Sequence, residues 1–162
     1  MDGNTDNKEK EIKALLKGKK IRPSIIRVKV LKYLLDNRNH PTADRLFSAL
    51  ENDIPTLSRT SIYNTLKTFL DEGVVSEITI EDGNSRYDAF TGKHGHFICE
   101  KCGGVSDFDV KCATCAPESL NGYKINQEHV YLRGLCPNCI KSGGDGNEKN
   151  FRKKRRIRST FI

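Results

Sequence analysis

The stretch from Ser58 to Ala89, SRTSIYNTLKTFLDEGVVSEITIEDGNSRYDA, contains the pattern that decides the fold. Ser58 is a suitable N-cap, because its hydroxyl can accept a hydrogen bond from the first turn of a helix. The apolar residues that follow recur at helical spacing and form one stripe: Ile62, Leu66, Phe69 and Leu70. Gly73 fits the position after a helix where a left-handed backbone is favoured. The pattern predicts a helix that ends near Gly73.

A β-hairpin is predicted immediately after this helix. Residues 74–80 have the composition of a strand, and Asp82-Gly83 is typical of a tight hairpin turn. Residues 85–89 then supply the returning strand. A helix followed by such a hairpin is the second half of a winged DNA-binding fold, so the residues upstream decide whether that fold is complete.

Two further helices are predicted upstream. Ser24 can cap the first, and its apolar stripe consists of Ile25, Val28, Leu31, Leu34 and Leu35. His40-Pro41 breaks this helix, because the residue before a proline is disfavoured in the helical region. Thr42 can cap the second helix, which ends at Ile54-Pro55-Thr56 and has one apolar face formed by Leu46, Phe47 and Leu50. Residues 9–16 are too short and too rich in lysine to predict a helix by themselves. Three helices and a hairpin predict a winged helix-turn-helix domain over residues 1–89.

A second, smaller domain is predicted over residues 90–140. Its short strands are expected at residues 95–100, 105–110 and 123–135. So small a core needs a metal crosslink or a dimer partner. The fold class is therefore α+β, with an N-terminal winged helix-turn-helix followed by a small α/β domain. Residues 141–162 begin with a Gly-rich linker at 142–147, and the basic run at 152–158 is expected to be disordered.

Charge is distributed unevenly along the 162 residues, whose net charge is +7. Residues 1–75 carry 14 basic and 10 acidic side chains, residues 76–140 carry 6 and 9, and residues 141–162 carry 8 and 2. Most of the basicity therefore lies in the tail, and its interpretations are a solubilising extension or non-specific attraction to phosphate. The opening segment is too charged for a signal peptide, and no apolar run is long enough to cross a membrane. We expect a cytoplasmic protein.

The helix that starts after Ser58 is the expected DNA-reading element. In a winged helix-turn-helix, the third helix enters the major groove with its first turns. These turns carry side chains that can bond to phosphates or base edges: Arg59, Thr60, Ser61, Tyr63 and Asn64. A merely solvated helix face is the alternative interpretation, and the hairpin favours DNA binding.

Two histidines predict a metal site with nitrogen and oxygen ligands. His94 and His96 lie two residues apart on a predicted strand, so both imidazoles point to one face. Nearby carboxylates are available from Asp88, Asp107 and Asp109. A mixed set of imidazoles and carboxylates suits exchangeable iron or manganese, although a hydrogen-bonded surface cluster is the alternative.

All six cysteines occur in Cys-x-x-Cys pairs, a pattern typical of thiols that are reduced or bound to zinc. Two of the three pairs are enough for a closed four-thiolate site. The spacing fits Cys112/Cys115 with Cys136/Cys139 best, because 20 residues separate these pairs. Cys99/Cys102 with Cys136/Cys139 is the alternative, and it spans a longer gap.

Four motifs resemble those of the ferric-uptake-regulator family of metal-dependent bacterial repressors, and most closely its peroxide-responsive branch. The motifs are His40-Pro41-Thr42-Ala43-Asp44, Ser61-Ile62-Tyr63-Asn64-Thr65-Leu66, Ser85-Arg86-Tyr87-Asp88, and the run from His94 to Gly103. The resemblance covers about residues 18–140. It implies a homodimer whose winged helices bind an inverted-repeat operator in double-stranded DNA, with the second domain forming the dimer interface.

The resemblance also implies the metal ligands. The structural zinc would be bound by Cys99, Cys102, Cys136 and Cys139, which leaves Cys112/Cys115 as an extra pair. The regulatory Fe²⁺ or Mn²⁺ would be bound by His40, Asp88, His94, His96 and Asp107. Aspartate at both carboxylate positions is typical of the peroxide-responsive branch, in which ferrous iron and hydrogen peroxide oxidise a histidine ligand. Arg22 matches a cation that relatives place in the minor groove.

Three other functions are alternatives to a peroxide-responsive repressor. An iron- or zinc-uptake regulator of the same family would use the same fold and sites. A redox enzyme could use Cys112/Cys115, but the surroundings of a thioredoxin-like motif are absent from the sequence. A metallohydrolase could use His94 and His96, but the sequence indicates no catalytic base. We therefore do not expect an enzyme.

Overall fold

The computed structural model describes residues 3–80, 84–90, 92–110, 120–125 and 128–142. The chain divides into two compact units, Met1–Lys93 and His94–Ile162. Within the described ranges, no helix is both long and apolar enough to span a bilayer. The turn at 82–83, the Cys112/Cys115 pair and the basic run at 152–158 lie outside the described residues, and so does all of the linker except Ser142.

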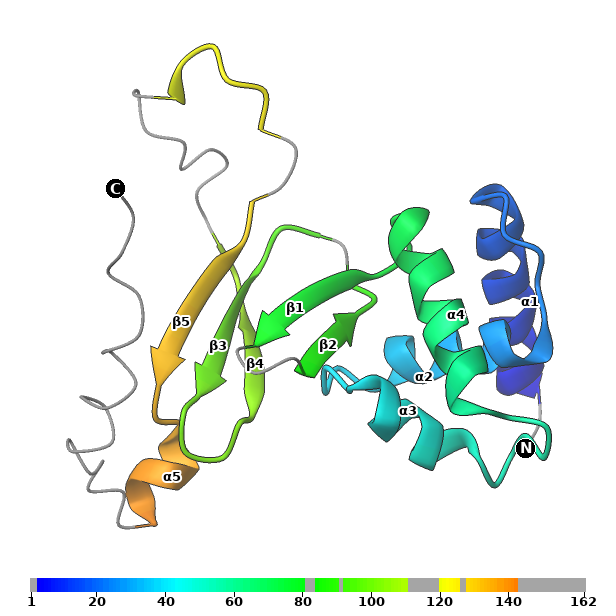
Figure 1. Cartoon of the computed structure of the whole chain (residues 1–162), viewed down its shortest axis with the longest axis horizontal. Helices are drawn as coiled ribbons and strands as arrows, with labels where there is room; N and C mark the ends of the chain where they lie inside the picture. Colours follow the sequence, from blue (N-terminus) through cyan, green and yellow to red (C-terminus); the bar gives the residue numbers. More distant parts are fainter. Residues whose placement is uncertain (1–2, 81–83, 91, 111–119, 126–127, 143–162) are drawn as a thin grey trace. The chain divides into compact units, whose positions relative to one another are not determined.

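The first unit consists of helices followed by a two-stranded hairpin (Figure 1). The helices are α1 (Gly3–Gly18), α2 (Ile25–Asp36), α3 (Ala43–Leu50) and α4 (Arg59–Asp71). The antiparallel hairpin pairs β1 (Ser76–Ile80) with β2 (Asn84–Asp88). The predicted α+β class is confirmed, with the three predicted helices and the hairpin strands in the predicted order.

The helix starts follow the predicted capping residues. Ser24 Oγ accepts a hydrogen bond from the N–H of Arg27, and Thr42 Oγ1 accepts one from the N–H of Arg45. At the start of α4, Ser58 Oγ accepts from the Ser61 N–H at 3.1 Å while Ser61 Oγ accepts from the Ser58 N–H at 3.0 Å. This capping box satisfies two backbone donors and fixes the first turn of the predicted DNA-reading helix.

Three boundary or burial predictions for the first unit are wrong. Residues 9–16 belong to the helix α1, which is stable because Ile12 and Leu16, on one face, are buried in the core. Ile25 is 72% exposed and Leu35 is 40% exposed, so the buried face of α2 is formed instead by Val28, Val30, Leu31 and Leu34. Helix α3 ends at Leu50, before Ile54-Pro55.

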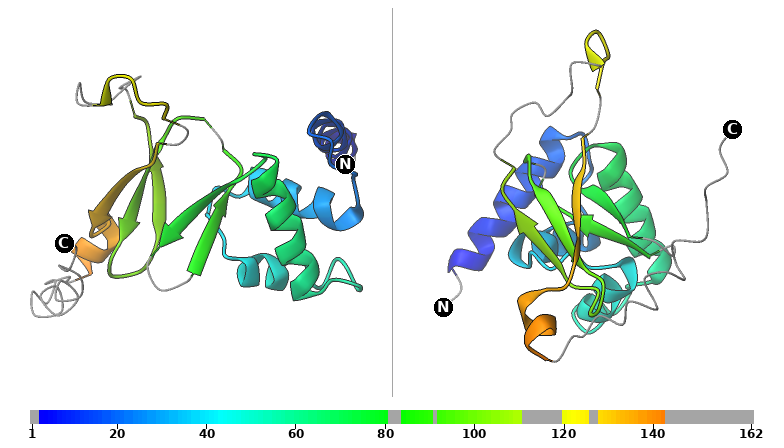
Figure 2. Two further views of the ribbon diagram at one scale, coloured as in Figure 1. Left: turned by 45° about the horizontal axis from the view of Figure 1, so that its top comes forward. Right: turned by 90° about the vertical axis from the view of Figure 1, so that its left-hand side faces the viewer.

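The second unit is built on a three-stranded sheet (Figure 2). Its strands are β3 (Gly95–Cys99), β4 (Val105–Phe108) and β5 (Val130–Gly134). The central strand β3 pairs antiparallel with β4 and parallel with β5. Strands occur in all three predicted regions, whereas the short helix α5 (Pro137–Lys141) that follows β5 was not predicted. A parallel β3–β5 pair brings residues far apart in sequence to one end of the sheet.

Candidate metal centres and nucleic-acid interface

Four cysteines converge where β3 ends and α5 begins. Cys99 is the last residue of β3, and Cys136 and Cys139 belong to the start of α5. The four Sγ atoms of Cys99, Cys102, Cys136 and Cys139 all lie within 4.8 Å of one another. The Sγ atoms of Cys102 and Cys136 are 3.9 Å apart. The structure therefore brings together the two pairs that the family resemblance implies.

Backbone hydrogen bonds hold the turn that carries Cys102. The N–H of Cys99 donates to the carbonyl of Gly104 at 2.8 Å, and the N–H of Gly103 donates to the carbonyl of Cys99 at 2.8 Å. Gly103 has a φ of +68°, in the left-handed region that favours glycine. The N–H of Glu100 donates to Gly134 at the end of β5, which joins the two cysteine-bearing segments.

The donor set of this cluster fits zinc. Four thiolates at about 2.3 Å from a tetrahedral ion lie about 3.8 Å from one another, close to the observed sulfur separation. Hydrogen bonds from the backbone N–H groups of Cys102 and Cys136 lower the pKa of Cys99 to about 6. The Cys136 side chain and burial raise the pKa of Cys139 to about 12. Four crowded thiolates repel one another without a cation, so a divalent ion would displace the remaining protons.

A second candidate centre lies on the sheet of the second unit. His96 faces Asp107 across the β3–β4 ladder, and His96 Nδ1 is 3.0 Å from Asp107 Oδ1. His94 Nε2 is 3.8 Å from the same oxygen. The two imidazole rings meet edge to face, with centroids 4.4 Å apart. Ligand atoms about 2.1 Å from an octahedral ion are about 3.0 Å apart, which is the spacing of the His96–Asp107 pair, and mixed imidazole and carboxylate donors suit iron or manganese.

Tyr131 on β5 supports His96 from the side of β3 opposite β4, a contact that was not predicted from the sequence. The two residues are neighbours in the parallel β3–β5 ladder, and their rings stack with centroids 5.9 Å apart. The next ring along, His129, stacks on Tyr131 at the same centroid distance. The parallel pairing of β3 with β5 could have revealed the contact, but sequence alone did not establish that register.

The first unit contains two predicted ligands of the regulatory metal. His40 Nε2 is 3.9 Å from Asp88 Oδ2, and both side chains are buried. The N–H of Phe90 donates to Asp88 Oδ1 at 2.8 Å, which orients the carboxylate. The guanidinium of Arg86 donates to the His40 carbonyl at 3.2 Å, and the Tyr87 N–H donates to the Pro41 carbonyl at 3.0 Å. Strand β2 thus fixes the segment that carries His40.

The predicted DNA-contacting residues on α4 differ in whether their side chains are exposed or already bonded within the protein. Thr60, Tyr63 and Asn64 are exposed, whereas the Ser61 hydroxyl takes part in the capping box. Arg59 forms an ion pair with Asp44, a residue of α3. Arg22 is also exposed, and it precedes α2. The assignment of all these residues to DNA stays a prediction.

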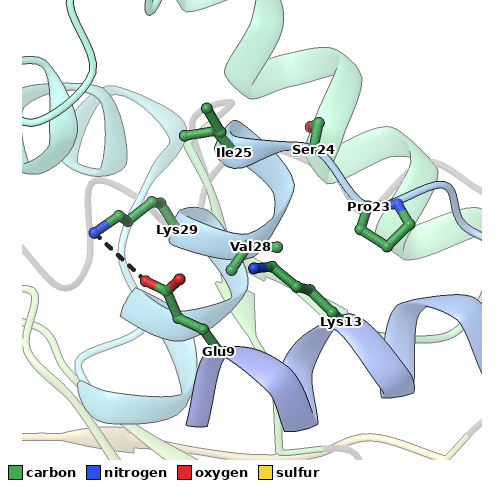
Figure 3. Close-up of a pocket in the computed structure, with 7 residues that line it drawn as sticks. All are labelled: Glu9, Lys13, Pro23, Ser24, Ile25, Val28 and Lys29. Atoms are coloured by element: carbon green, nitrogen blue, oxygen red, sulfur yellow. Dashed lines mark ion pairs between the residues drawn. The ribbon is translucent and has the colours of Figure 1, made fainter. Parts of the chain in front are cut away.

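A pocket of about 310 Å³ lies between α1 and α2 (Figure 3). Lys29 and Glu9 form an ion pair of 3.7 Å at one side, and Lys13 also lines the pocket. The remaining lining residues are Pro23, Ser24, Ile25 and Val28. No residue predicted to bind metal or DNA lines this pocket, so it is not part of either candidate site.

Comparisons with known proteins identify one family of regulators. Residues 18–133 match a family model described as the ferric uptake regulator family. The peroxide operon regulator of Bacillus subtilis (strain 168) is 35% identical over 135 residues, covering 82% of this chain and 93% of that protein. The peroxide-responsive repressor PerR of Staphylococcus epidermidis is 34% identical over 139 residues, covering 83% and 91%. The solved ferric uptake regulator of Helicobacter pylori has a TM-score of 0.62 at 19% identity, covering 83% of this chain and 93% of that one, a likeness in fold.

Proposed function

Because the chain belongs to the ferric uptake regulator family, we propose that it is a metal-dependent, DNA-binding transcriptional repressor that responds to hydrogen peroxide. The curated relatives named above are peroxide-responsive regulators. The observation that carries the proposal is the convergence of His94, His96 and Asp107 on one face of the second unit. This set is chemically distinct from the nearby four-cysteine cluster, so one chain offers two kinds of metal site.

The four-cysteine cluster is proposed to hold a structural zinc ion. Its ligands would be Cys99, Cys102, Cys136 and Cys139, whose sulfur atoms lie close enough to share one ion. A closed all-thiolate site leaves no open coordination position, so it suits a structural rather than a reactive role. The metal would crosslink β3 to the segment that follows β5.

The regulatory Fe²⁺ or Mn²⁺ is proposed to take ligands from both units. His40 and Asp88 would come from the first unit, and His94, His96 and Asp107 would come from the second. An ion that binds both sets favours the arrangements of the two units in which both sets reach it. Metal occupancy would thereby shift the population toward the DNA-binding arrangement, and loss of metal would release the DNA.

The response to peroxide depends on how the chain holds the histidine ligands. Bound ferrous iron would react with hydrogen peroxide, and the histidine ligand that becomes oxidised would be His40 or His96. Asp107 and the stacked ring of Tyr131 fix the orientation of the His96 imidazole. The buried position of His96 limits its contact with bulk solvent. An oxidised imidazole would bind metal less well, which couples peroxide to release of DNA.

The repressor is proposed to act as a homodimer on an inverted-repeat operator. Two-fold symmetric dimers match two half-sites on double-stranded DNA. Leu132 on the edge strand β5 is 52% exposed and Ile140 on α5 is 59% exposed. Exposed apolar side chains of this kind can be covered by a second copy of the chain. Helix α4 would enter the major groove with Thr60, Tyr63 and Asn64, and Arg22 would contact the minor groove.

An anaerobic binding experiment tests the proposal. The protein is purified without oxygen, loaded with Fe²⁺ or Mn²⁺, and used to select its preferred duplex from a random DNA library. Binding to that duplex is then measured before and after a pulse of hydrogen peroxide, with peptide mass spectrometry on the same samples. The proposal expects release only from the iron-loaded protein, with added oxygen mass on a histidine peptide. Metal-dependent binding that is indifferent to peroxide would instead identify an iron- or zinc-uptake regulator.

A further inference from the structure

Arg59, the first residue of the predicted DNA-reading helix, is held by two side chains of α3. Its guanidinium pairs with the carboxylate of Asp44, and its Cζ lies 4.8 Å from the centroid of the Phe47 ring. The side chains of Arg59 and Asp44 are 59% and 64% exposed. We call the pair of Asp44 and Phe47 the Arg59 clamp. It lies at the surface where both helices begin, so incoming DNA can reach it.

The groups around Arg59 differ in side-chain length and in packing. Asp44 lies in the first turn of α3, where the helix dipole stabilises a negative charge. Phe47 packs against the core of the first unit, which fixes the ring under the guanidinium. Arg59 has a long flexible side chain and can leave without breaking either helix. The Phe47 ring is therefore the fixed partner, and the guanidinium, on the longest of the three side chains, is the group that can move.

We propose that Asp44 is a specificity-determining residue for DNA, because it withholds Arg59 from phosphates until a suitable base edge is present. This inference rests on the proposed function. A phosphate that approaches Arg59 also approaches the negative charge of Asp44, and like charges repel. A guanine edge offers two acceptors to an arginine without a formal negative charge. The clamp thus penalises the sequence-independent contact more than the base contact, and specificity is that difference.

The change Asp44→Asn separates these two contacts. It leaves the side-chain shape nearly unchanged but frees Arg59 to neutralise a phosphate on any sequence. We expect affinity for mixed-sequence DNA to rise about fivefold or more. The plot of log affinity against log salt concentration should steepen by about one for each protomer, or about two for a dimer. The ratio of affinities for the selected and mixed duplexes should fall.

The test is a double-mutant cycle on the full chain loaded with Mn²⁺. Wild type, Asp44→Asn, Arg59→Gln and the double variant are compared with Asp53→Asn, which removes another exposed carboxylate of the first unit. Fluorescence anisotropy measures binding to a 40-base-pair mixed-sequence duplex (about four helical turns) and to the duplex selected from the random library. Salt is varied from about 50 to 200 mM.

The expected result is a gain on mixed-sequence DNA in Asp44→Asn that disappears when Arg59 is also replaced. A gain that persists in the Arg59→Gln background, or an equal gain in Asp53→Asn, would show a general charge effect and overturn the proposal. Loss of binding to the selected duplex in both backgrounds would also overturn it, because Asp44 would then contact a base itself.

Phe47→Leu gives a second test that leaves the net charge unchanged. This change removes the ring under Arg59. It should raise the affinity for mixed-sequence DNA, as Asp44→Asn does, but by a smaller factor. If neither Phe47→Leu nor Asp44→Asn increases the affinity for mixed-sequence DNA, the clamp is refuted. Failure of the wild type to select any preferred duplex would refute the proposed repressor function instead. The salt dependence on mixed-sequence DNA would still decide the role of Asp44 in that case.

Discussion

Replacement of Cys139 by serine is expected to unfold the second unit while the first unit stays folded. Cys139 is buried in the four-cysteine cluster, and its sulfur lies within 4.8 Å of the other three. A serine hydroxyl is a poor zinc ligand, so the variant would have only three thiolates for the ion. The second unit would then lose the crosslink between β3 and α5.

The size of this effect follows from how little apolar surface the second unit buries. Among its described residues, Ile98 is the one buried aliphatic side chain. Burial of such a side chain contributes about 1.5–3 kcal/mol. Structural zinc contributes about 10–16 kcal/mol near neutral pH. Loss of the metal therefore costs several times more than loss of the central apolar residue, and the sheet should not survive it.

Hydrogen–deuterium exchange on the full chain, with zinc content measured on the same sample, checks this prediction. Peptides that cover β3 and β5 should lose protection in Cys139→Ser, whereas peptides that cover α2 and α4 should keep it. Cys112→Ser is the matched control, because Cys112 is not one of the four proposed zinc ligands, and this variant should retain one zinc per chain. A variant at Cys139 that keeps protection across β3 after losing its zinc would refute the reasoning.

Three further predictions concern the metal sites and the α4 boundary. Asp107→Asn should weaken Mn²⁺ binding by at least about 10- to 100-fold in calorimetry, whereas the exposed Asp109→Asn should not. The pKa of Cys99 is lowered to about 6, so this thiol is already ionised between that pH and about 9. Zinc affinity should therefore fall more steeply with falling pH below about 6 than above it, because Cys99 must then also lose a proton to bind the ion, and competition with a chelator measures this change of slope. Gly73 has a φ of +62°, and nothing lies within 4 Å of an added Cβ. Gly73→Ala should therefore lower the free energy of unfolding in urea by about 1–2 kcal/mol, through backbone strain alone. Gly18→Ala is the control, because no positive φ occurs there, and it should not lower this free energy.

Local signals in the sequence predicted most of the first unit correctly. Ser24, Thr42 and Ser58 cap the helices that their positions predicted. Gly73 adopts the left-handed conformation expected after α4. These features depend on hydrogen bonds between residues three or four apart, so short stretches of sequence specify them. The same local rules failed for α1, because its helix depends on the packing of Ile12 and Leu16 against the distant core.

Spacing in the sequence could not select the cysteine pairs, because the choice depends on strand pairing. Cys99 lies opposite Gly134 in the parallel β3–β5 ladder, and this register places Cys136 beside the turn that carries Cys102. The 20-residue interval that favoured Cys112/Cys115 contains no information about that register. A parallel pair is joined through a long connection, so its partners are invisible to local periodicity.

The sequence alone determined which residue types could bind metal or DNA, because ligand chemistry and helix or strand periodicity are properties of the residues and their near neighbours. Only the tertiary structure decided which of them meet: Asp107 with His96 across β3–β4, and Asp44 with Arg59 between α3 and α4. Both contacts join residues of different elements, 11 and 15 positions apart in the sequence. Their formation depends on the burial of apolar faces and the pairing of strands elsewhere in each unit.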